Sequence, residues 1–167
     1  QGASERNISA VIAHKDIKKA LVTLHNRFFE KQIKTLNLFI VGVRNVGRIL
    51  IEQINHQQDY LRENLMLNIK VVGVSNSRMM YFDEEGIDLH SWEHLLKNGV
   101  ARTHKTLSEK VKALNLSNSI FLDITANPSV AETYADFLKE SISVVACNKI
   151  ACASSFQSYQ NLKYLSK

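Results

Sequence analysis

Four short, nearly continuous hydrophobic runs stand out along the chain, at residues 38–41, 69–74, 119–124 and 142–146. They are rich in β-branched residues and contain few charges. Runs of this kind are typical of strands that are buried on both faces, as in a parallel sheet. The pattern therefore predicts a central parallel sheet.

Between the runs, apolar residues recur at steps of three and four, which is the period of an amphipathic helix. This pattern predicts helices over 46–61, 107–114 and 130–138. Strands that alternate with helices favour right-handed βαβ units. The expected fold class is α/β, with a Rossmann-like doubly wound parallel sheet.

Shorter signals complete this outline. The polar stretch 78–86 predicts a loop, and 88–97 predicts a helix with Trp92 on its apolar face. Asn127 and Pro128 directly follow the third run and predict the start of a helix there. An asparagine caps a helix well, and the missing N–H of proline costs nothing in the first turn.

The first 36 residues fit this alternation less well. Residues 8–13 predict a strand, and 15–31 predict an amphipathic helix. One strand and one helix cannot bury themselves alone, so residues 1–36 are expected to be the end of a preceding domain. The Rossmann domain then covers 37–167. The expected inward residues of the helix are Ile17, Ala20, Leu21, Leu24 and Phe28.

Composition narrows the class of protein. The 167 residues, of which 45% are hydrophobic and 22% charged, suit a globular chain of about one domain. The net charge of +5 suits an anionic ligand, but the lysines are scattered, so nucleic acid is not an expected partner. No apolar run approaches the roughly 18 residues of a membrane span, so no membrane partner is expected either.

The cysteines and histidines argue against a disulfide framework and against a metal site. The only two cysteines, Cys147 and Cys152, exclude a disulfide framework and favour a reducing, cytoplasmic location. His90 and His94 stand four residues apart but lack a third ligand, so no metal site is expected.

The clearest motif is F-I-V-G-V-R-N-V-G-R at 39–48, directly after the first predicted strand. It occupies the strand–turn–helix position of the dinucleotide fingerprint G-x-G-x-x-G. The first glycine permits the tight turn, the last lets the helix pack closely, and the helix start faces the pyrophosphate. The candidate cofactor-binding residues of this turn are Gly42, Val43, Arg44, Asn45, Val46 and Gly47.

Arg44 replaces the middle glycine of the fingerprint. Its Cβ stands where the backbone normally approaches the phosphates, whereas its guanidinium can pair with them. The alternative is a strand–helix turn that uses two glycines without binding a nucleotide.

The end of the second strand usually decides between the two nicotinamide cofactors, because an acidic residue there binds the ribose hydroxyls of NAD. Here the chain reads V-S-N-S-R at 74–78, with no acid and with Arg78 following. The candidate ribose-binding residues Asn76, Ser77 and Arg78 therefore favour NADP(H) and leave NAD(H) open. The alternative is a polar loop with a solvated arginine.

The ends of the third and fourth strands are expected to complete the crevice. Thr125, with Ala126 beside it, can contact the cofactor, and Cys147 is expected to line the crevice without acting as a nucleophile. Lys149 is the candidate catalytic residue, because a fixed cation can hold an anion or polarise a carbonyl. The alternative for Lys149 is a solvated loop lysine.

Six segments in this order resemble the nucleotide-binding region of homoserine dehydrogenase, in the form fused to aspartokinase. They are F-I-V-G-V-x-x-V-G-x-x-L at 39–50, E-Q-I-x-x-Q-Q at 52–58, V-x-G-V-x-N-S at 71–77, D-x-T at 123–125, Y-A-D-F-L-K-E at 134–140 and V-V-x-x-N-K at 144–149. Residues 1–36 resemble the closing strand and helix of an ACT regulatory region.

The resemblance implies an oxidoreductase that interconverts L-homoserine and L-aspartate 4-semialdehyde with NAD(P) in threonine and methionine synthesis. It implies that Val43, Asn45 and Val46 contact the pyrophosphate, that Thr125 lies by the nicotinamide and that Lys149 lies near the reacting centre. It also implies a homo-oligomer for the full protein. In this family the substrate domain lies downstream, so the 167 residues are expected to bind a nucleotide but to be inactive alone.

A regulatory or interaction module with a degenerate nucleotide site is the alternative function. It is kept open by departures from the family pattern at Arg44, Ala126, Cys147 and Ile150. The two functions differ in their ligand: a dehydrogenase domain responds to NADPH or NADH, whereas a regulatory module responds to threonine without binding nucleotide.

Overall fold

The computed structural model describes all residues except 1, 5–6 and 30–32. The chain separates into two compact units, residues 1–32 and 33–167. Each unit is considered by itself below.

The N-terminal unit is a short hairpin followed by a helix. Strand β1 (Gly2–Ser4) pairs antiparallel with β2 (Asn7–Ser9), and a 3-10 turn, η1 (His14–Asp16), precedes α1 (Ile17–Phe29). The predicted strand over 8–13 is wrong beyond Ser9. The predicted helix is confirmed from Ile17 to Phe29, and its last two residues lie outside the described part of the chain.

Of the five residues of α1 that were expected to face inward, only Ala20 is half-buried. The side chains of Ile17, Leu21, Leu24 and Phe28 are exposed, with Phe28 at 74%. A hairpin of two three-residue strands offers too little apolar surface to cover a helix face.

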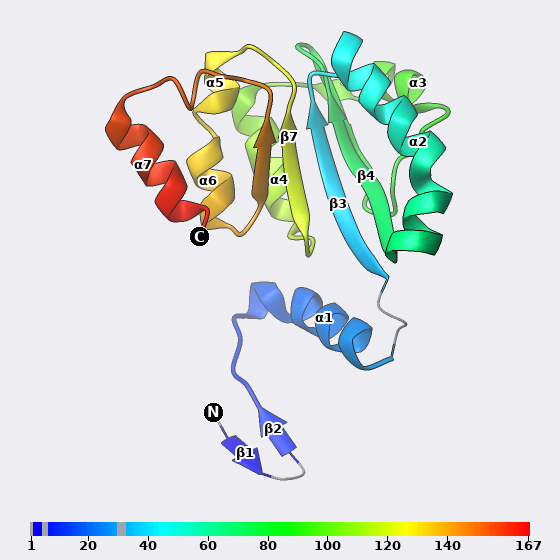
Figure 1. The fold of residues 1–167 in the computed structure, drawn as a ribbon, viewed down its shortest axis with the longest axis vertical. Helices are drawn as coiled ribbons and strands as arrows, with labels where there is room; N and C mark the ends of the chain where they lie inside the picture. The colour runs from blue at the N-terminus through cyan, green and yellow to red at the C-terminus, as the bar shows by residue number, and fades with distance from the viewer. Residues whose placement is uncertain (1, 5–6, 30–32) are drawn as a thin grey trace. The chain divides into compact units, whose positions relative to one another are not determined.

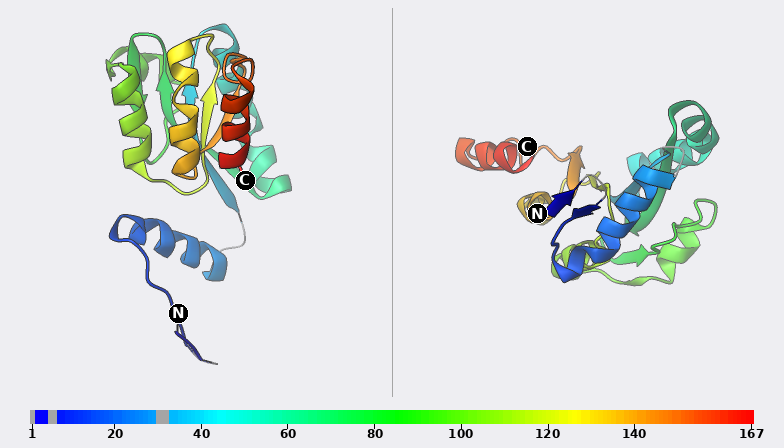
Figure 2. Two further views of the ribbon diagram at one scale, coloured as in Figure 1. Left: turned by 90° about the vertical axis from the view of Figure 1, so that its left-hand side faces the viewer. Right: turned by 90° about the horizontal axis from the view of Figure 1, so that it is seen from below.

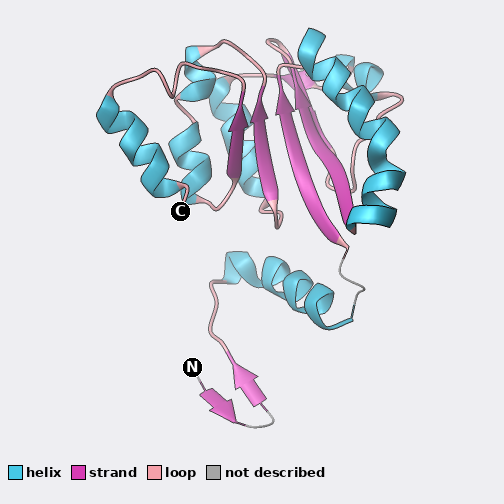
Figure 3. Cartoon of the chain, viewed as in Figure 1, coloured by secondary structure: helices cyan, strands magenta, loops and turns pink. Residues whose placement is uncertain are grey.

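The second unit is built on a six-stranded sheet of order β6-β5-β4-β3-β7-β8. The last four strands in this order are parallel to one another, as the arrowheads in Figure 3 show. They are β4 (Leu67–Ser75), β3 (Lys34–Val41), β7 (Ser119–Asp123) and β8 (Ser143–Ala146). All four hydrophobic runs are thus confirmed as parallel strands, and the first strand begins at Lys34, ahead of the boundary drawn at 37.

Helices cover both faces of this sheet, which confirms the doubly wound α/β fold (Figures 1 and 2). On one face α2 and α3 bury Ile51, Ile54 and Trp92 against the strands; on the other, α4 and α6 bury Val111 and Phe137. The helices are α2 (Asn45–Leu65), α3 (Trp92–Lys97), α4 (His104–Leu114), α5 (Pro128–Ala131), α6 (Tyr134–Lys139) and α7 (Phe156–Leu165).

Two segments differ from the sequence prediction. The stretch 78–86 is not all loop, because β5 (Met79–Phe82) pairs antiparallel with β4 and with the short β6 (Val100–Ala101). The ring of Phe82 packs over Gly73 of β4, where any Cβ would lie 2.8 Å from the ring. The helix predicted over 130–138 is two helices, α5 and α6, separated by a turn.

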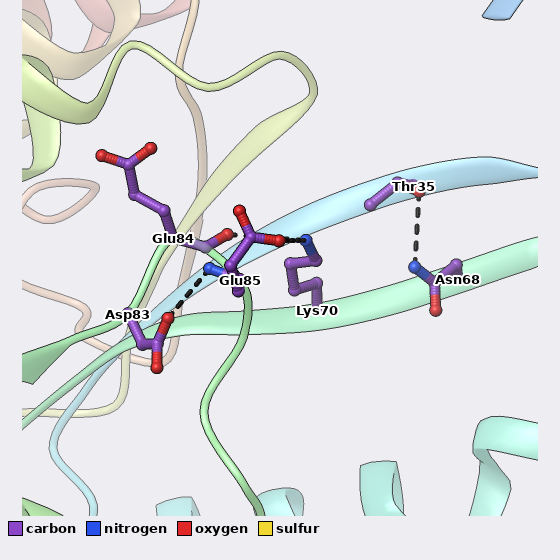
Figure 4. A network of polar contacts seen from close by, with 6 residues as sticks. All are labelled: Thr35, Asn68, Lys70, Asp83, Glu84 and Glu85. Atoms are coloured by element: carbon purple, nitrogen blue, oxygen red, sulfur yellow. Dashed lines mark hydrogen bonds and ion pairs between the residues drawn. The ribbon is translucent and has the colours of Figure 1, made fainter.

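A polar network fixes the turn after β5 to the amino-terminal half of β4 (Figure 4). Lys70 Nζ contacts the Glu84 carbonyl at 3.5 Å and the Glu85 carboxylate at 3.9 Å, and Asp83 accepts from the Glu85 N–H. The carboxyl ends of the parallel strands lie at the opposite edge of the sheet. The network therefore lies far from the carboxyl ends of the strands, where the glycine-containing turn follows β3.

Candidate cofactor site

The carboxyl ends of β3, β4 and β7 meet at one point of the sheet. Val41 pairs with Ser75 of β4 on one side and with Asp123 of β7 on the other. The chain leaves β3 first towards β4 and later returns to pair β7 on the opposite side. Such a reversal of strand order opens a crevice, and ligands of doubly wound sheets bind there.

The turn from β3 into α2 requires both of its glycines. Gly42 has φ +101°, and a Cβ on it would lie 2.5 Å from the carbonyl oxygen of Ile124. A Cβ on Gly47 would collide with the Gly42 carbonyl. The Gly42 N–H donates to the Ser75 carbonyl at 2.8 Å, which ties the turn to β4. The turn therefore lies tightly against the ends of both neighbouring strands.

Helix α2 begins without a cap. Arg44 is its N-cap residue, its side chain accepts no capping hydrogen bond, and the first turn contains no acidic residue. Arg44, Asn45 and Val46 are exposed, whereas Val43 and Gly47 are buried. The start of a 21-residue helix is thus presented to solvent with its N–H groups and positive dipole end, which is the arrangement that binds phosphate groups.

The segment after β4 forms a tight turn, named here the β4 turn (residues 75–79). Asn76 Oδ1 accepts from the N–H groups of Arg78 and Met79, both at 2.8 Å. The buried Ser75 hydroxyl donates to carbonyls within the same turn. The side-chain oxygen of Asn76 is therefore occupied by hydrogen bonds within the turn. The exposed side chains of the turn are those of Ser77 and Arg78.

A buried polar network joins the ends of β7 and β8. Asp123 is fully buried, and its Oδ2 accepts from the Tyr134 hydroxyl at 2.5 Å and from Asn148 Nδ2 at 3.0 Å. Its Oδ1 accepts from the Thr125 N–H at 2.8 Å. Burial, followed by the hydrogen bond to Asp123, raises the pKa of Tyr134 above its ordinary value, so the phenol stays a donor.

This network positions two of the sequence-predicted residues. Thr125 is half-buried and fixed through its N–H, and the exposed Lys149 follows Asn148, whose Oδ1 accepts from the Ile150 N–H at 3.1 Å. The Cys147 N–H donates to the Asp123 carbonyl at 2.8 Å, and its thiol is exposed. Ala126 is exposed beside Thr125.

Sequence reasoning missed the three buried members of the network. A carboxylate at the end of an apolar run, as at Asp123, is the signal that could have indicated a buried, fully hydrogen-bonded group. Tyr134 and Asn148 carry no such local signal, because their role depends on contacts 11 and 25 residues away along the chain.

The described residues contain neither a candidate metal cluster nor a candidate membrane-spanning helix. No group of three or more His, Cys, Asp or Glu side chains in that part of the chain is arranged to hold a metal ion. No helix within it combines the length and hydrophobicity needed to cross a membrane.

Residues 42–167 match the family described as "Homoserine dehydrogenase, NAD binding domain". The chain therefore belongs to the family of homoserine dehydrogenase NAD-binding domains. This membership agrees with the α/β fold, the strand order and the glycine turn after β3.

Two similar whole proteins are bifunctional enzymes. The chain is 36% identical over 98% of its length to the bifunctional aspartokinase/homoserine dehydrogenase of Haemophilus influenzae, and 34% identical over its whole length to a chloroplastic form from Zea mays. It spans only 20% and 18% of the lengths of these two proteins.

Solved homoserine dehydrogenases share the fold. A mutant hyperthermophilic archaeal homoserine dehydrogenase in complex with NADPH superposes with a TM-score of 0.60 at 25% identity. The match covers 80% of this chain and 41% of the archaeal chain.

Proposed function

We propose that this chain is the nucleotide-binding part of an aspartokinase-fused homoserine dehydrogenase and binds NADP(H) in preference to NAD(H). The observation that carries the proposal is the uncapped start of α2 beside the glycine turn, at the point where the strand order reverses. The family membership and the NADPH complex of the archaeal relative support the same cofactor class.

The glycine turn fits a pyrophosphate. Because the backbone at Gly42 and Gly47 has no room for a Cβ, the chain there follows one tight path and the helix start stays open. In the proposal the N–H groups of Asn45 and Val46 donate to the pyrophosphate oxygens, whereas the Val43 N–H donates to the Ser75 carbonyl at 3.4 Å and helps to hold the turn against β4. Arg44 is exposed at the same helix start, and its guanidinium adds a positive charge there.

The β4 turn fits a 2′-phosphate better than a ribose with two free hydroxyls. No acidic residue stands at residues 74–78, and Arg78 is exposed with no described carboxylate paired to it. A guanidinium binds a phosphate dianion through charge-assisted hydrogen bonds, whereas it gains little from a neutral hydroxyl. The turn thereby supports NADP(H) over NAD(H).

The nicotinamide end of the cofactor is proposed to lie by Thr125 and Lys149. When bound, the cofactor would supply the hydride acceptor for oxidation of L-homoserine to L-aspartate 4-semialdehyde and the hydride donor for the reverse reduction. Lys149 projects from the loop after β8 as a positive charge, and its neighbour Asn148 is held by Asp123. The ammonium group can stabilise the negative charge that develops on the substrate oxygen during the transfer.

The rest of the proposal concerns the full protein and is supported by the resemblance and the bifunctional relatives. The full protein is proposed to act in the synthesis of threonine and methionine as a cytoplasmic homo-oligomer. Because the chain spans about a fifth of those relatives, the isolated 167 residues are proposed to bind the cofactor without turning over homoserine.

Replacing Arg78 with methionine is expected to weaken NADPH binding about tenfold, the size of one lost hydrogen bond to a charged group. NADH binding is expected to change less than about twofold, because NADH lacks the 2′-phosphate. The measurement is a fluorescence titration of each nucleotide. The matched control is Arg62→Met, which removes the same charge at the other end of α2, where Arg62 bonds Asn68. Equal loss of both nucleotides in Arg78→Met would count against the 2′-phosphate site.

A further inference from the structure

We propose that Arg102 is a second determinant of NADP(H) specificity, a half-buried cation beside the β4 turn that stabilises the 2′-phosphate together with Arg78. Neither the family motifs nor the sequence pattern points to this residue. The inference rests on the proposed function, because it concerns the same cofactor.

Arg102 is fastened to the β4 turn at two points. It follows the edge strand β6, and its backbone N–H donates to the Arg78 carbonyl at 2.8 Å. Its Nη1 donates to the main-chain carbonyl of Asn76, also at 2.8 Å. One residue thus contacts the β4 turn at both Asn76, 26 residues earlier in the sequence, and Arg78.

The rest of the guanidinium has no partner. Nε and Nη2 of Arg102 are both buried and form no hydrogen bond to any described residue. No described carboxylate forms an ion pair with it either. Asp123 is the acid that acts on its charge, yet the carboxylate oxygens of Asp123 are already occupied by Thr125, Tyr134 and Asn148.

The positive charge of Arg102 has no paired carboxylate among the described residues, so an anion placed near it is stabilised. Burial lowers the pKa of Arg102, with Asp123 opposing the shift, but an arginine remains charged at neutral pH. A charge that is partly withdrawn from water acts over several ångströms with less screening than a surface charge. A phosphate placed on the β4 turn would therefore feel the field of Arg102 without touching its buried nitrogens.

The adenosine 2′-phosphate is the group that this position selects. In dinucleotide folds the ribose of the adenosine half lies at the end of the second parallel strand, which here is the end of β4. NADP carries a dianionic group at that ribose, whereas NAD carries a neutral hydroxyl. A cation behind the turn therefore discriminates between the two cofactors.

If Arg102 only held the β4 turn in place, its substitution would weaken the binding of NADPH and NADH equally. The test uses the 167-residue chain with two substitutions of opposite character. Arg102→Gln keeps an amide donor for the Asn76 carbonyl and removes the charge, and Arg102→Lys keeps the charge. Arg62→Met is the control for the loss of a distant positive charge.

For Arg102→Gln we expect the dissociation constant of NADPH to rise about tenfold and that of NADH to change less than about twofold. Arg102→Lys should retain the preference for NADPH to within about threefold. Parallel weakening of both nucleotides in Arg102→Gln, or an unchanged preference for NADPH, overturns the inference while leaving the proposed function intact. A wild-type chain that binds neither nucleotide overturns the proposed function itself.

A second measurement covers the case in which Arg102→Gln does not fold. The Arg78→Met chain is titrated with 2′,5′-ADP and with 5′-AMP, two fragments that differ only in the 2′-phosphate. A second cation at Arg102 predicts a residual preference of about threefold or more for 2′,5′-ADP. Loss of the whole preference in Arg78→Met overturns the role of Arg102.

Discussion

Replacing Asp123 with alanine is expected to lower the free energy of unfolding by about 3–5 kcal/mol, because it strands several buried donors at once. The Tyr134 hydroxyl and the Thr125 N–H both lose their acceptor, and Asn148 Nδ2 keeps only its bond to the Asn127 carbonyl. Urea unfolding followed by circular dichroism measures the loss.

Two variants calibrate this result. Tyr134→Phe removes one donor and keeps the acceptor, so it should cost about 1–2 kcal/mol. Asp136→Ala removes an exposed carboxylate from α6. The only described ion pair of Asp136 is a 3.9 Å contact with Lys139, so this substitution should change the free energy of unfolding by less than about 0.5 kcal/mol. An Asp123→Ala chain as stable as Asp136→Ala would contradict the role assigned to the buried network.

Gly42→Ala is expected to destabilise the chain by about 3–5 kcal/mol and to abolish NADPH binding. At φ +101° an alanine is strained, and its Cβ would lie 2.5 Å from the rigid Ile124 carbonyl oxygen and 2.9 Å from the Thr125 side chain. Relief of these contacts requires movement of the turn away from β7, which displaces the start of α2. Thermal unfolding and a nucleotide titration measure the two effects.

Gly86→Ala is a matched control for this substitution. Gly86 has nearly the same backbone angle, φ +105°, but its Cβ would meet the flexible side chain of Lys70 at 2.9 Å. We expect a loss of about 1–2 kcal/mol and unchanged NADPH binding. If Gly42→Ala and Gly86→Ala behaved alike in both measurements, the close packing of the glycine turn would not matter for the site.

The parallel strands and their helices could be predicted because each leaves a local signal. The run at 38–41 is hydrophobic at every position, and its short length and the glycine that follows it favour a buried strand over a buried helix. Strand β5 is different: Met79–Phe82 lies on the antiparallel side of the sheet, in a stretch surrounded by polar residues. Its place depends on pairing with β4, which no periodicity within the segment reveals.

Some residues of the candidate site also leave a local signal in the sequence, and others do not. Gly42 and Gly47 were recognisable from their spacing, because backbone geometry is a local property. The partners of Asp123 and the position of Arg102 were not, because each contact joins segments that are distant in sequence and close only after folding. For the same reason the amphipathic pattern of α1 predicted a buried face, although periodicity alone does not provide a surface to cover it.

The most direct test of the central claim is to add NADP⁺ to the 15N-labelled chain and record which amide resonances shift. Binding at the proposed site predicts shifts for the residues of the glycine turn at 42–47, for the β4 turn at 75–79 and for Thr125. The amides of Glu84 and Glu85, which lie in the network at the amino-terminal half of β4, should stay in place (Figure 4). An unchanged spectrum at millimolar NADP⁺, or shifts that avoid both turns, would contradict a dinucleotide site at the ends of β3, β4 and β7.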